Sequence, residues 1–398
     1  MIYYSSVMSE RRKRIVFPFV EAGYGHIMPM KAVADVFEEK YGDRCEVIRT
    51  NFYGDSNNEA LVACEKKLIK QVFKMSKYPL QSFIYKLASK LGGHKATTRF
   101  PWKTWYKSSF IPALERMKDF EADLIFNTYY STLYYACEAK KRGLIDSKVA
   151  AYCPDPFISE FLDRRVDLMT ISTDIGKERA EKQRGFKKTE ARIEVVPFLL
   201  QKKVKDYTKT KEEYKQELGL DPKKFTILLC DGSYGVGKIK KTVKQLMTLP
   251  HEFNLIAVCG KNEQLYEEFK QITPPSNITF LPFGFTDKML ILSAASDLFI
   301  GKSGASNMAE ANYFSAPVII TLSPSPVEKL IARYHLKYSK TAIKARRVKT
   351  AVKKAEEFML DRGKMQYLVD NCKKHARSDG AEMLADLLWE GLDESGGW

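Results

Sequence analysis

The chain has no apolar run that approaches the ~20 residues of a membrane-spanning helix, although 44% of its 398 residues are hydrophobic. It shows no export signal either, because the basic residues at positions 11–14 fall between two short apolar pieces. The strand-like pattern begins only after Met8, which makes Met8 an alternative start. We therefore expect a protein that neither spans a membrane nor is exported.

Cysteine and histidine are too scattered to build a disulfide framework or a metal cluster. The seven cysteines form no C-x-x-C pair, and most lie in apolar, strand-like stretches. We interpret them as small buried residues of a protein kept in a reducing compartment. The five histidines are widely dispersed, and we expect no structural metal. Repeats and low-complexity segments are also missing.

Positive charge, in contrast, is abundant and concentrated. The net charge is +16, and residues 65–118 contain thirteen Lys or Arg against two acids, with nine aromatic residues among them. Lysines alternate with apolar residues at helical spacing, a pattern typical of a helix that lies on an anionic membrane surface. The candidate membrane-contacting residues are Lys66, Lys67, Lys70, Lys74, Phe83, Trp102 and Trp105. A solvated helical face and nucleic-acid binding through phosphates are the alternatives.

Strand and helix patterns alternate in both halves of the chain, with a polar linker expected at 201–211. Expected strands lie at 14–20, 46–52, 124–128, 148–153, 168–172 and 193–196, and then at 226–230, 255–259, 278–283, 298–301 and 317–321. Expected helices lie at 27–41, 133–142, 174–184, 238–247, 263–271 and 287–295, with a helical tail from 342 onward. This order predicts an α/β protein with two doubly wound sheets that face each other across a cleft. We place the first domain at 1–200 and the second at 201–379.

A Gly-x-Gly-His motif follows the first expected strand. Gly23 and Gly25 permit a tight turn, and His26 then begins the helix. Because ligands of open α/β sheets bind beyond the carboxyl ends of the strands, His26 is a candidate general base, a role that suits histidine near neutral pH. The alternative is a structural turn with a helix-capping histidine.

Two glycine-rich turns in the second half are suited to phosphate. Residues 231–238 imitate a P-loop, but Ile239 replaces the Ser or Thr that would bind Mg²⁺. A carboxylate is unfavourable near a diphosphate, so we expect Asp231 to point away or to cap a helix. The turn at 302–306 opens a helix, whose amino end offers unpaired N–H groups and a positive dipole. Glu310 on that helix can accept hydrogen bonds from two ribose hydroxyls.

These motifs, in this order, resemble the monogalactosyldiacylglycerol synthase and processive diacylglycerol glucosyltransferase family of GT-B glycosyltransferases, which is related to the lipid II-forming N-acetylglucosaminyltransferase. The resemblance implies a GT-B fold with two Rossmann-like domains and a last helix, 380–398, that returns to the first domain. It identifies His26 as the catalytic base. It also implies a donor site formed by Gly232, Ser233, Gly235, Gly260, Lys261, Gly284, Phe285, Thr286, Ser303, Gly304, Ala305, Ser306, Glu310 and Glu328, with the glycines of the Gly-x-Gly-His turn, Gly23 and Gly25, on the acceptor side.

One motif departs from the family pattern. Members carry P-G-Q-E-x-x-N, whose amide side chains face the donor sugar, whereas this chain has Pro326, Val327, Glu328 and Ile331 at the corresponding positions. Valine and isoleucine cannot hydrogen-bond to sugar hydroxyls. An unusual donor sugar, a local shift of the alignment and a loss of activity are three competing explanations.

The resemblance implies an inverting transfer of a hexose from a UDP-sugar to a lipid hydroxyl, with diacylglycerol as the expected acceptor, at the cytoplasmic face of the cell membrane. UDP-hexose would be a co-substrate, no cofactor or metal would be needed, and an anionic membrane surface would be a partner. Two alternatives stay open: a degenerate, non-catalytic relative that binds nucleotide-sugar or membrane, and an enzyme with a polyisoprenoid or glycolipid acceptor. Nucleic-acid binding rests on charge alone and is not expected.

Overall fold

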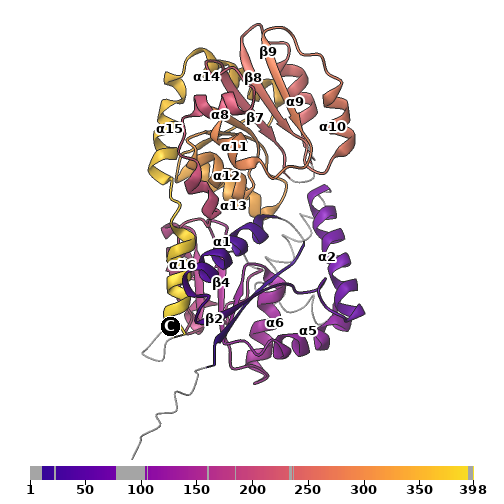
Figure 1. Cartoon of the computed structure of the whole chain (residues 1–398), viewed down its shortest axis with the longest axis vertical. Coiled ribbons are helices and arrows are strands. Elements are labelled where there is room, and N and C mark those ends of the chain that lie inside the picture. The colour runs from indigo at the N-terminus through magenta and orange to yellow at the C-terminus, as the bar shows by residue number, and fades with distance from the viewer. Residues whose placement is uncertain are drawn as a thin grey trace, which may run out of the picture.

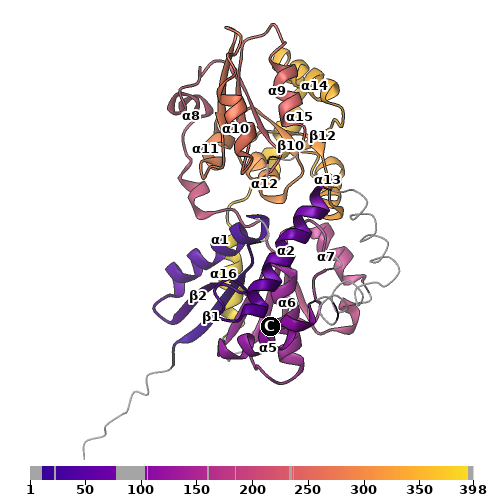
Figure 2. The same ribbon diagram turned by 90° about the vertical axis from the view of Figure 1, so that its right-hand side faces the viewer.

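The computed structural model describes residues 11–21, 24–77, 104, 106–158, 161–183, 185–232, 235, 237–392 and 398. Two sheets of six parallel strands, each flanked by helices, form two halves that are stacked along the long axis of the molecule (Figure 1). Helices α1, α2, α12 and α13 lie where the halves meet (Figures 1 and 2). The two doubly wound sheets expected from the sequence are confirmed.

The first sheet has the order β2-β1-β3-β4-β5-β6. Its strands are β1 (Lys13–Phe19), β2 (Cys45–Asn51), β3 (Leu124–Asn127), β4 (Lys148–Cys153), β5 (Leu168–Ile171) and β6 (Arg192–Val195). The helices of this half are α1 (Tyr24–Tyr41), α2 (Glu59–Lys77), α5 (Lys107–Asp119), α6 (Tyr130–Lys141) and α7 (Asp174–Glu181). The inner strands β3, β4 and β5 are entirely buried apart from Lys148, as expected for a parallel sheet covered on both faces.

The second sheet has the order β12-β11-β10-β7-β8-β9. Its strands are β7 (Phe225–Cys230), β8 (Phe253–Val258), β9 (Ile278–Phe283), β10 (Leu298–Lys302), β11 (Val318–Leu322) and β12 (Ala342–Lys344). The helices are α8 (Lys211–Glu217), α9 (Ile239–Leu246), α10 (Glu263–Lys270), α11 (Met289–Ala294), α12 (Ala305–Tyr313), α13 (Pro326–Lys337), α14 (Val348–Leu360) and α15 (Gly363–His375).

Two segments differ from the sequence-based expectation. The polar stretch at 201–211 is a short 3-10 turn, Lys202–Asp206, with Val204 buried at its centre, and it leads directly into α8. The tail begins with strand β12 instead of a helix, because Ala342 and Ile343 pair with the buried strand β11. The stretch at 201–211 still connects the two sheets, so only the tail is a correction. Both features depend on contacts that are distant in sequence, which local polarity does not reveal.

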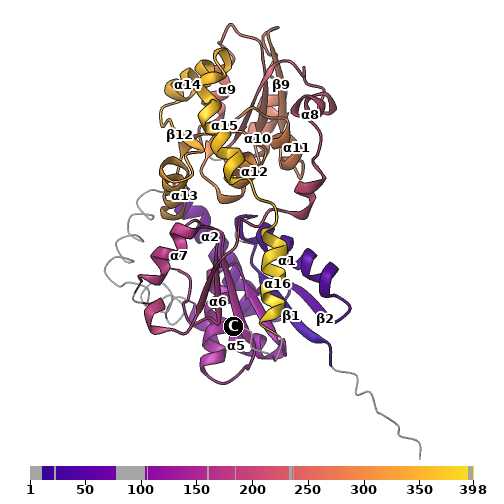
Figure 3. The same cartoon turned by 90° about the vertical axis from the view of Figure 1, so that its left-hand side faces the viewer.

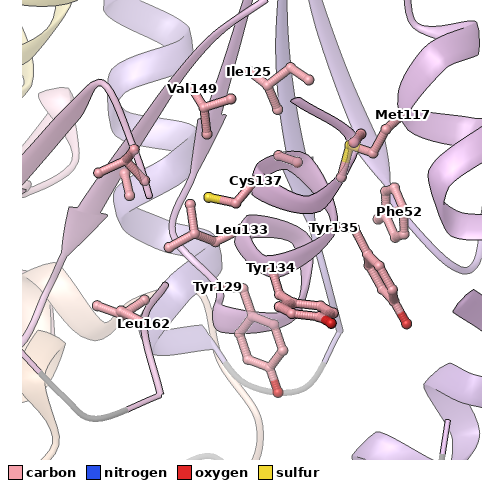
Figure 4. Packing of buried hydrophobic residues seen from close by; sticks show 14 of the residues in the cluster. Phe52, Met117, Ile125, Tyr129, Leu133, Tyr134, Tyr135, Cys137, Val149 and Leu162 are labelled. Carbon is pink, nitrogen blue, oxygen red and sulfur yellow. The ribbon is translucent and has the colours of Figure 1, made fainter. Parts of the chain in front are cut away.

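A cluster of large aromatic residues fills the space between α6 and the elements around it (Figure 4). Phe52 stacks on Tyr135 with ring centroids 5.8 Å apart. The apolar face of α2 joins this cluster through Leu61, Cys64 and Leu68, all nearly inaccessible to solvent. The apolar face of this part of α2 therefore packs into the protein, and the expectation that it lies in a bilayer is wrong for Leu68.

The last helix, α16 (Gly380–Glu390), packs against α1 in the first half (Figure 3). Trp389 stacks on Tyr41 at a centroid distance of 4.6 Å, and Leu384 and Leu388 are completely buried. The last helix therefore contributes to the core of the first half.

All seven cysteines are buried and unbridged, which confirms their interpretation as packing residues. Within the described parts of the chain, no helix has both the length and the apolar character needed to cross a bilayer.

Candidate active site

The candidate site is built where the strand order reverses in each sheet. In the first sheet the reversal lies between β1 and β3, and in the second it lies between β10 and β7. Ligands of open α/β sheets bind at such switch points, beyond the carboxyl ends of the strands. The turns after β1 and β3, and those after β7 and β10, are therefore the turns to examine.

His26 lies in the first turn of α1, directly after the switch point of the first sheet. Its Nδ1 is 2.8 Å from the carbonyl oxygen of Thr128, the residue that follows β3, and the Thr128 hydroxyl donates to the His26 carbonyl at 2.9 Å. Since a carbonyl can only accept, Nδ1 carries the proton and Nε2 carries the free lone pair. This arrangement prepares Nε2 to take a proton.

The surroundings keep the His26 ring neutral. Burial lowers the pKa of His26 to about 4, against the smaller raising effect of the Thr128 hydrogen bond. The ring also packs edge-on against Tyr129, with centroids 5.1 Å apart. Next to it, a side chain at Gly25 would meet no atom within 4 Å, so space is open beside the histidine.

Asp155 belongs to the same edge of the first sheet, two residues beyond β4, and sequence analysis gave it no role. Its carboxyl group is buried, and within the described part of the chain it has no hydrogen-bond or ion-pair partner. Burial, with a contribution from the negative charge of Glu328, raises the pKa of Asp155 to about 7. Asp155 follows β4, which lies next to β3 in the sheet, so it is near the switch point. Only the strand order reveals this position.

The two halves touch beside Asp155. Phe157 packs against Tyr338 of the second half at a centroid distance of 6.0 Å. Arg179 covers the Phe157 ring at 4.5 Å and donates to the Tyr338 hydroxyl at 2.6 Å. This contact brings α13 against the first half, so Asp155 and Glu328 approach each other from opposite halves.

We expect the Asp155→Asn variant to be more stable than the wild type above neutral pH. The folded protein holds the Asp155 proton more tightly than the unfolded chain, whose aspartate titrates near the ordinary value of 3.8. Stability is therefore lost as the pH rises from about 4 through 7, by an amount on the order of 4 kcal/mol. Thermal unfolding at about pH 4 and pH 8 tests this; an advantage of Asn that does not grow with pH would contradict it.

The glycine-rich turn after β7 has the backbone of a phosphate-binding loop. Gly232 and Gly235 have φ values of +86° and +57°, which favour glycine. A Cβ at Gly235 would lie 2.1 Å from the carbonyl oxygen of Cys259. Asp231 accepts hydrogen bonds from the backbone N–H groups of Lys238 and Ile239 at 2.7 and 3.0 Å. Asp231 thus caps α9 as expected, and its carboxylate is occupied there.

Lys302, at the end of β10, reaches this turn. A Cβ at Gly232 would lie 2.4 Å from the Cε atom of Lys302 and 2.9 Å from its Nζ. The same Nζ is 3.0 Å from the Glu328 carboxylate. A cation therefore lies against the turn, a position that suits a diphosphate. Sequence analysis named Lys302 in its motif but gave it no role, because its reach depends on how β10 and β7 pair.

The amino end of α12 faces the same switch point. Gly304 is the N-cap residue, and no side chain caps the helix, so the first N–H groups are open to an anion. The hydroxyl of Ser306 is buried without a partner among the described residues. Ser303 is already engaged, with Ser323 at 2.8 Å and with the Glu328 carbonyl at 2.9 Å.

Glu310 lies further along α12, where its buried carboxyl group has no hydrogen-bond or ion-pair partner in the described part of the chain. Burial raises its pKa to about 7. A buried carboxyl group without partners is costly, unless a ligand supplies donors. Two neighbouring hydroxyls would satisfy both oxygens.

The turns after β8 and β9 carry further residues of the expected donor site. Gly260 has φ +60°, and the Lys261 ammonium lies 5.4 Å from the Phe285 ring centre. The Phe285 side chain is 53% exposed, so a flat ligand can reach it. The neighbouring residues are Gly284, which faces Tyr266, and Thr286, which accepts a hydrogen bond from the Lys288 N–H.

Comparison with known proteins identifies a known domain in the second half. The glycosyltransferase family 28 C-terminal domain matches residues 226–360, which contain every described residue of the expected donor site. The chain therefore carries a glycosyltransferase family 28 C-terminal domain in its second half. It is 21% identical to the processive diacylglycerol beta-glucosyltransferase of Bacillus licheniformis over 94% of each chain.

Two further relatives match less of their own length. Monogalactosyldiacylglycerol synthase 1 of Arabidopsis thaliana is 22% identical over 79% of this chain and 59% of the relative. The UDP-N-acetylglucosamine--N-acetylmuramyl-(pentapeptide) pyrophosphoryl-undecaprenol N-acetylglucosamine transferase of Aquifex aeolicus is 32% identical over 30% of this chain and 33% of the relative. The chain thus spans about a third of the length of this last relative.

Solved structures share the fold. Acinetobacter baumannii MurG has a TM-score of 0.60 at 14% identity. The match covers 95% of this chain and 99% of the MurG chain. Anabaena HepE, solved in complex with UDP and glucose, has a TM-score of 0.55 at 13% identity over 96% and 99% of the two chains. The GT-B fold expected from the sequence is thereby confirmed.

The motif at 326–331, which departs from the family pattern, forms the start of α13. Sequence analysis did not predict this helix. Ser325 and Glu328 form a capping box, in which Glu328 accepts from the Ser325 N–H at 2.9 Å. Ile331 is buried in the core, and Val327 packs against the same cluster. The side chains that replace the family's amides therefore complete the packing of the protein. Glu328, in turn, is already paired with Lys302.

Several residues that the sequence predicted for the site or for membrane contact lie outside the described part of the chain. They are Gly23 of the Gly-x-Gly-His turn and Ser233 of the glycine-rich turn, together with Phe83, Trp102, Trp105 and the side chain of Lys74. Lys66, Lys67 and Lys70 are described, and all three are exposed on α2, on the side away from its buried apolar face.

Proposed function

We propose that this chain is a glycosyltransferase that transfers a hexose from a UDP-sugar to the hydroxyl group of a membrane lipid, with inversion at the anomeric carbon. Diacylglycerol is the expected acceptor. The supporting observation is the orientation of His26, whose Nε2 is free while Nδ1 is held by Thr128. The UDP-bound neighbour and the diacylglycerol-acting relative support the choice of donor and acceptor.

The chemistry is a single displacement. The lipid hydroxyl oxygen bonds to the anomeric carbon as its proton passes to Nε2 of His26. The bond between that carbon and the diphosphate oxygen breaks, and UDP leaves with the electron pair. The N–H groups of the Gly232 turn and of the α12 amino end, with Lys302 beside them, stabilise the negative charge that develops on UDP. In this proposal these groups supply the stabilisation that a metal ion supplies in other enzymes.

UDP release from the purified protein, with diacylglycerol in anionic vesicles, tests the function. UDP-glucose, UDP-galactose and UDP-N-acetylglucosamine are compared, and the lipid products are resolved. We expect lipid-dependent release from one donor, which names the sugar despite Val327 and Ile331. UDP binding without release from any donor would instead favour a non-catalytic role or an enzyme with another acceptor.

We further propose that the enzyme works while bound to the inner face of the cell membrane, with the cations of α2 in contact with anionic headgroups. Lys66, Lys67 and Lys70 are exposed, while Leu61, Cys64 and Leu68 of the same helix are buried. This arrangement favours an electrostatic contact over an inserted helix.

Replacing Lys66, Lys67 and Lys70 with glutamine is expected to weaken vesicle binding by about 1 kcal/mol per cation. Salt screens exposed charges, so the loss should be larger at low than at high ionic strength. Co-sedimentation with anionic and neutral vesicles measures it. An equal loss on neutral vesicles, or one insensitive to salt, would contradict the electrostatic contact.

A further inference from the structure

A hollow of about 360 Å³ opens in the second half, beyond the carboxyl ends of β11 and β12. We call it the basic hollow, because six cations and no carboxylate line it. The cations are Lys238, Lys329, Arg333, Lys337, Lys344 and Arg346. Its volume is that of a site for a small ligand.

The helix α13 supplies three of these cations from a single face. Lys329, Arg333 and Lys337 are spaced four residues apart, so they line up along the helix. Lys344 and Arg346 come from the end of β12 and the turn after it. The Lys238 ammonium donates to the carbonyl oxygen of Arg346, which ties the opposite wall to that turn.

Five of the six cations have no hydrogen-bond or ion-pair partner for their side chains within the described residues: Lys329, Arg333, Lys337, Lys344 and Arg346. Some other surface lysines of this half are paired with acids, as Lys240 is with Glu268 and Lys270 with Glu267. Like charges gathered around one concavity repel each other, and an anion bound among them removes that cost.

The basic hollow is separate from the donor site. None of the expected donor residues lines it. Ser303, which belongs to the donor site, is bound to Ser323, which lines the hollow, so one hydrogen bond separates the two. Of the described residues of the glycine-rich turn, Lys238 alone lines the hollow.

We propose that the basic hollow is a second anion site, which binds a phosphate-bearing ligand independently of UDP. A phosphate group presents several acceptor oxygens, matching guanidinium and ammonium donors that converge from two walls. The phosphate can belong to an anionic phospholipid or to a free phosphate compound. A lipid source fits the placement of α13, which lies on the same side of the molecule as the far end of α2 (Figures 2 and 3).

The test compares an Arg333→Ala/Lys337→Ala double variant with a control, Lys373→Ala/Lys374→Ala, which removes the same charge from exposed positions on α15. Pyrophosphate binding is measured by calorimetry with saturating UDP present. Vesicle binding is measured on phosphatidylcholine with and without phosphatidylglycerol. UDP affinity is measured for all three proteins. Alanine is a good helix former, so both variants should fold.

We expect the double variant to lose about tenfold or more in affinity for one anion probe, while its UDP affinity and the control stay unchanged. A loss confined to pyrophosphate identifies a free phosphate ligand, and a loss confined to phosphatidylglycerol vesicles identifies a lipid headgroup. Two results would overturn the proposal: the same anion binding in the double variant and the control, or a parallel loss of UDP affinity, which would make the hollow part of the donor site.

Discussion

The His26→Ala variant is expected to lose at least about 100-fold in kcat, with little change in its affinity for UDP. The reason is geometric. Nδ1 of His26 is committed to the Thr128 carbonyl, so Nε2 is the ring atom that can take the acceptor proton. The UDP site proposed above lies in turns of the other half, and removing the imidazole leaves those turns intact.

Two further variants make this test specific. His26→Gln keeps most of the volume and should be as inactive as alanine. His251→Ala removes a histidine at the amino end of the second sheet, paired with Glu356 at 2.9 Å, and should keep full turnover. Since the pKa of His26 is about 4, its protonation should not lower the rate between about pH 6 and 8. Turnover of His26→Ala within a few-fold of wild type would remove this residue as the base.

The Glu310→Gln variant is expected to bind UDP-glucose about 10- to 100-fold more weakly, because hydrogen bonds to a charged group contribute about 1.5–3 kcal/mol. Glu310 is buried at the donor switch point without a partner in the described chain, and the ribose hydroxyls are the donors proposed for it. Calorimetry with UDP-glucose and its 2′-deoxyribose analogue isolates this contact. The affinities of wild type and variant should differ less for the analogue than for UDP-glucose.

The affinity should also depend on pH. The carboxylate accepts from both hydroxyls, whereas the protonated form accepts less well, so ligand binding favours the ionised form. With a pKa of about 7 for Glu310, the affinity of the wild type rises with pH through this value, and that of the glutamine variant does not. The exposed Glu263, changed to glutamine in the same half, is the matched control. Equal losses for UDP-glucose and its deoxy analogue would contradict ribose recognition by Glu310.

Much of the site could be predicted from local sequence. A buried apolar run followed by a glycine turn marks the carboxyl end of a strand, and this placed the turns at Gly232, Gly260 and Ser303 correctly. The capping role of Asp231 followed from the cost of a carboxylate near a diphosphate. Such features depend on residues only a few positions apart, which periodicity and turn chemistry report directly.

Other features depended on packing between distant segments. The lysines and apolar residues of α2 predicted a surface helix, but Leu61 and Leu68 pack into the core around α6, while Lys66, Lys67 and Lys70 stay exposed. The replaced amides of the family motif left an unusual donor sugar, an alignment shift and a loss of activity open, and only the structure shows that Ile331 is a core residue of α13. Sequence polarity cannot tell which partner an apolar face will find.

The sequence by itself determined the two alternating α/β halves, the glycine turns and the chemical groups available at them, because these follow from burial, backbone freedom and side-chain type. The tertiary structure alone decided which groups meet. The strand order placed His26 beside Thr128, with Asp155 just after the neighbouring strand β4. It also brought Lys302 against the Gly232 turn and gathered six cations around the basic hollow. Strand pairing and helix docking are set by the summed burial of the whole chain, so no local stretch of sequence encodes them.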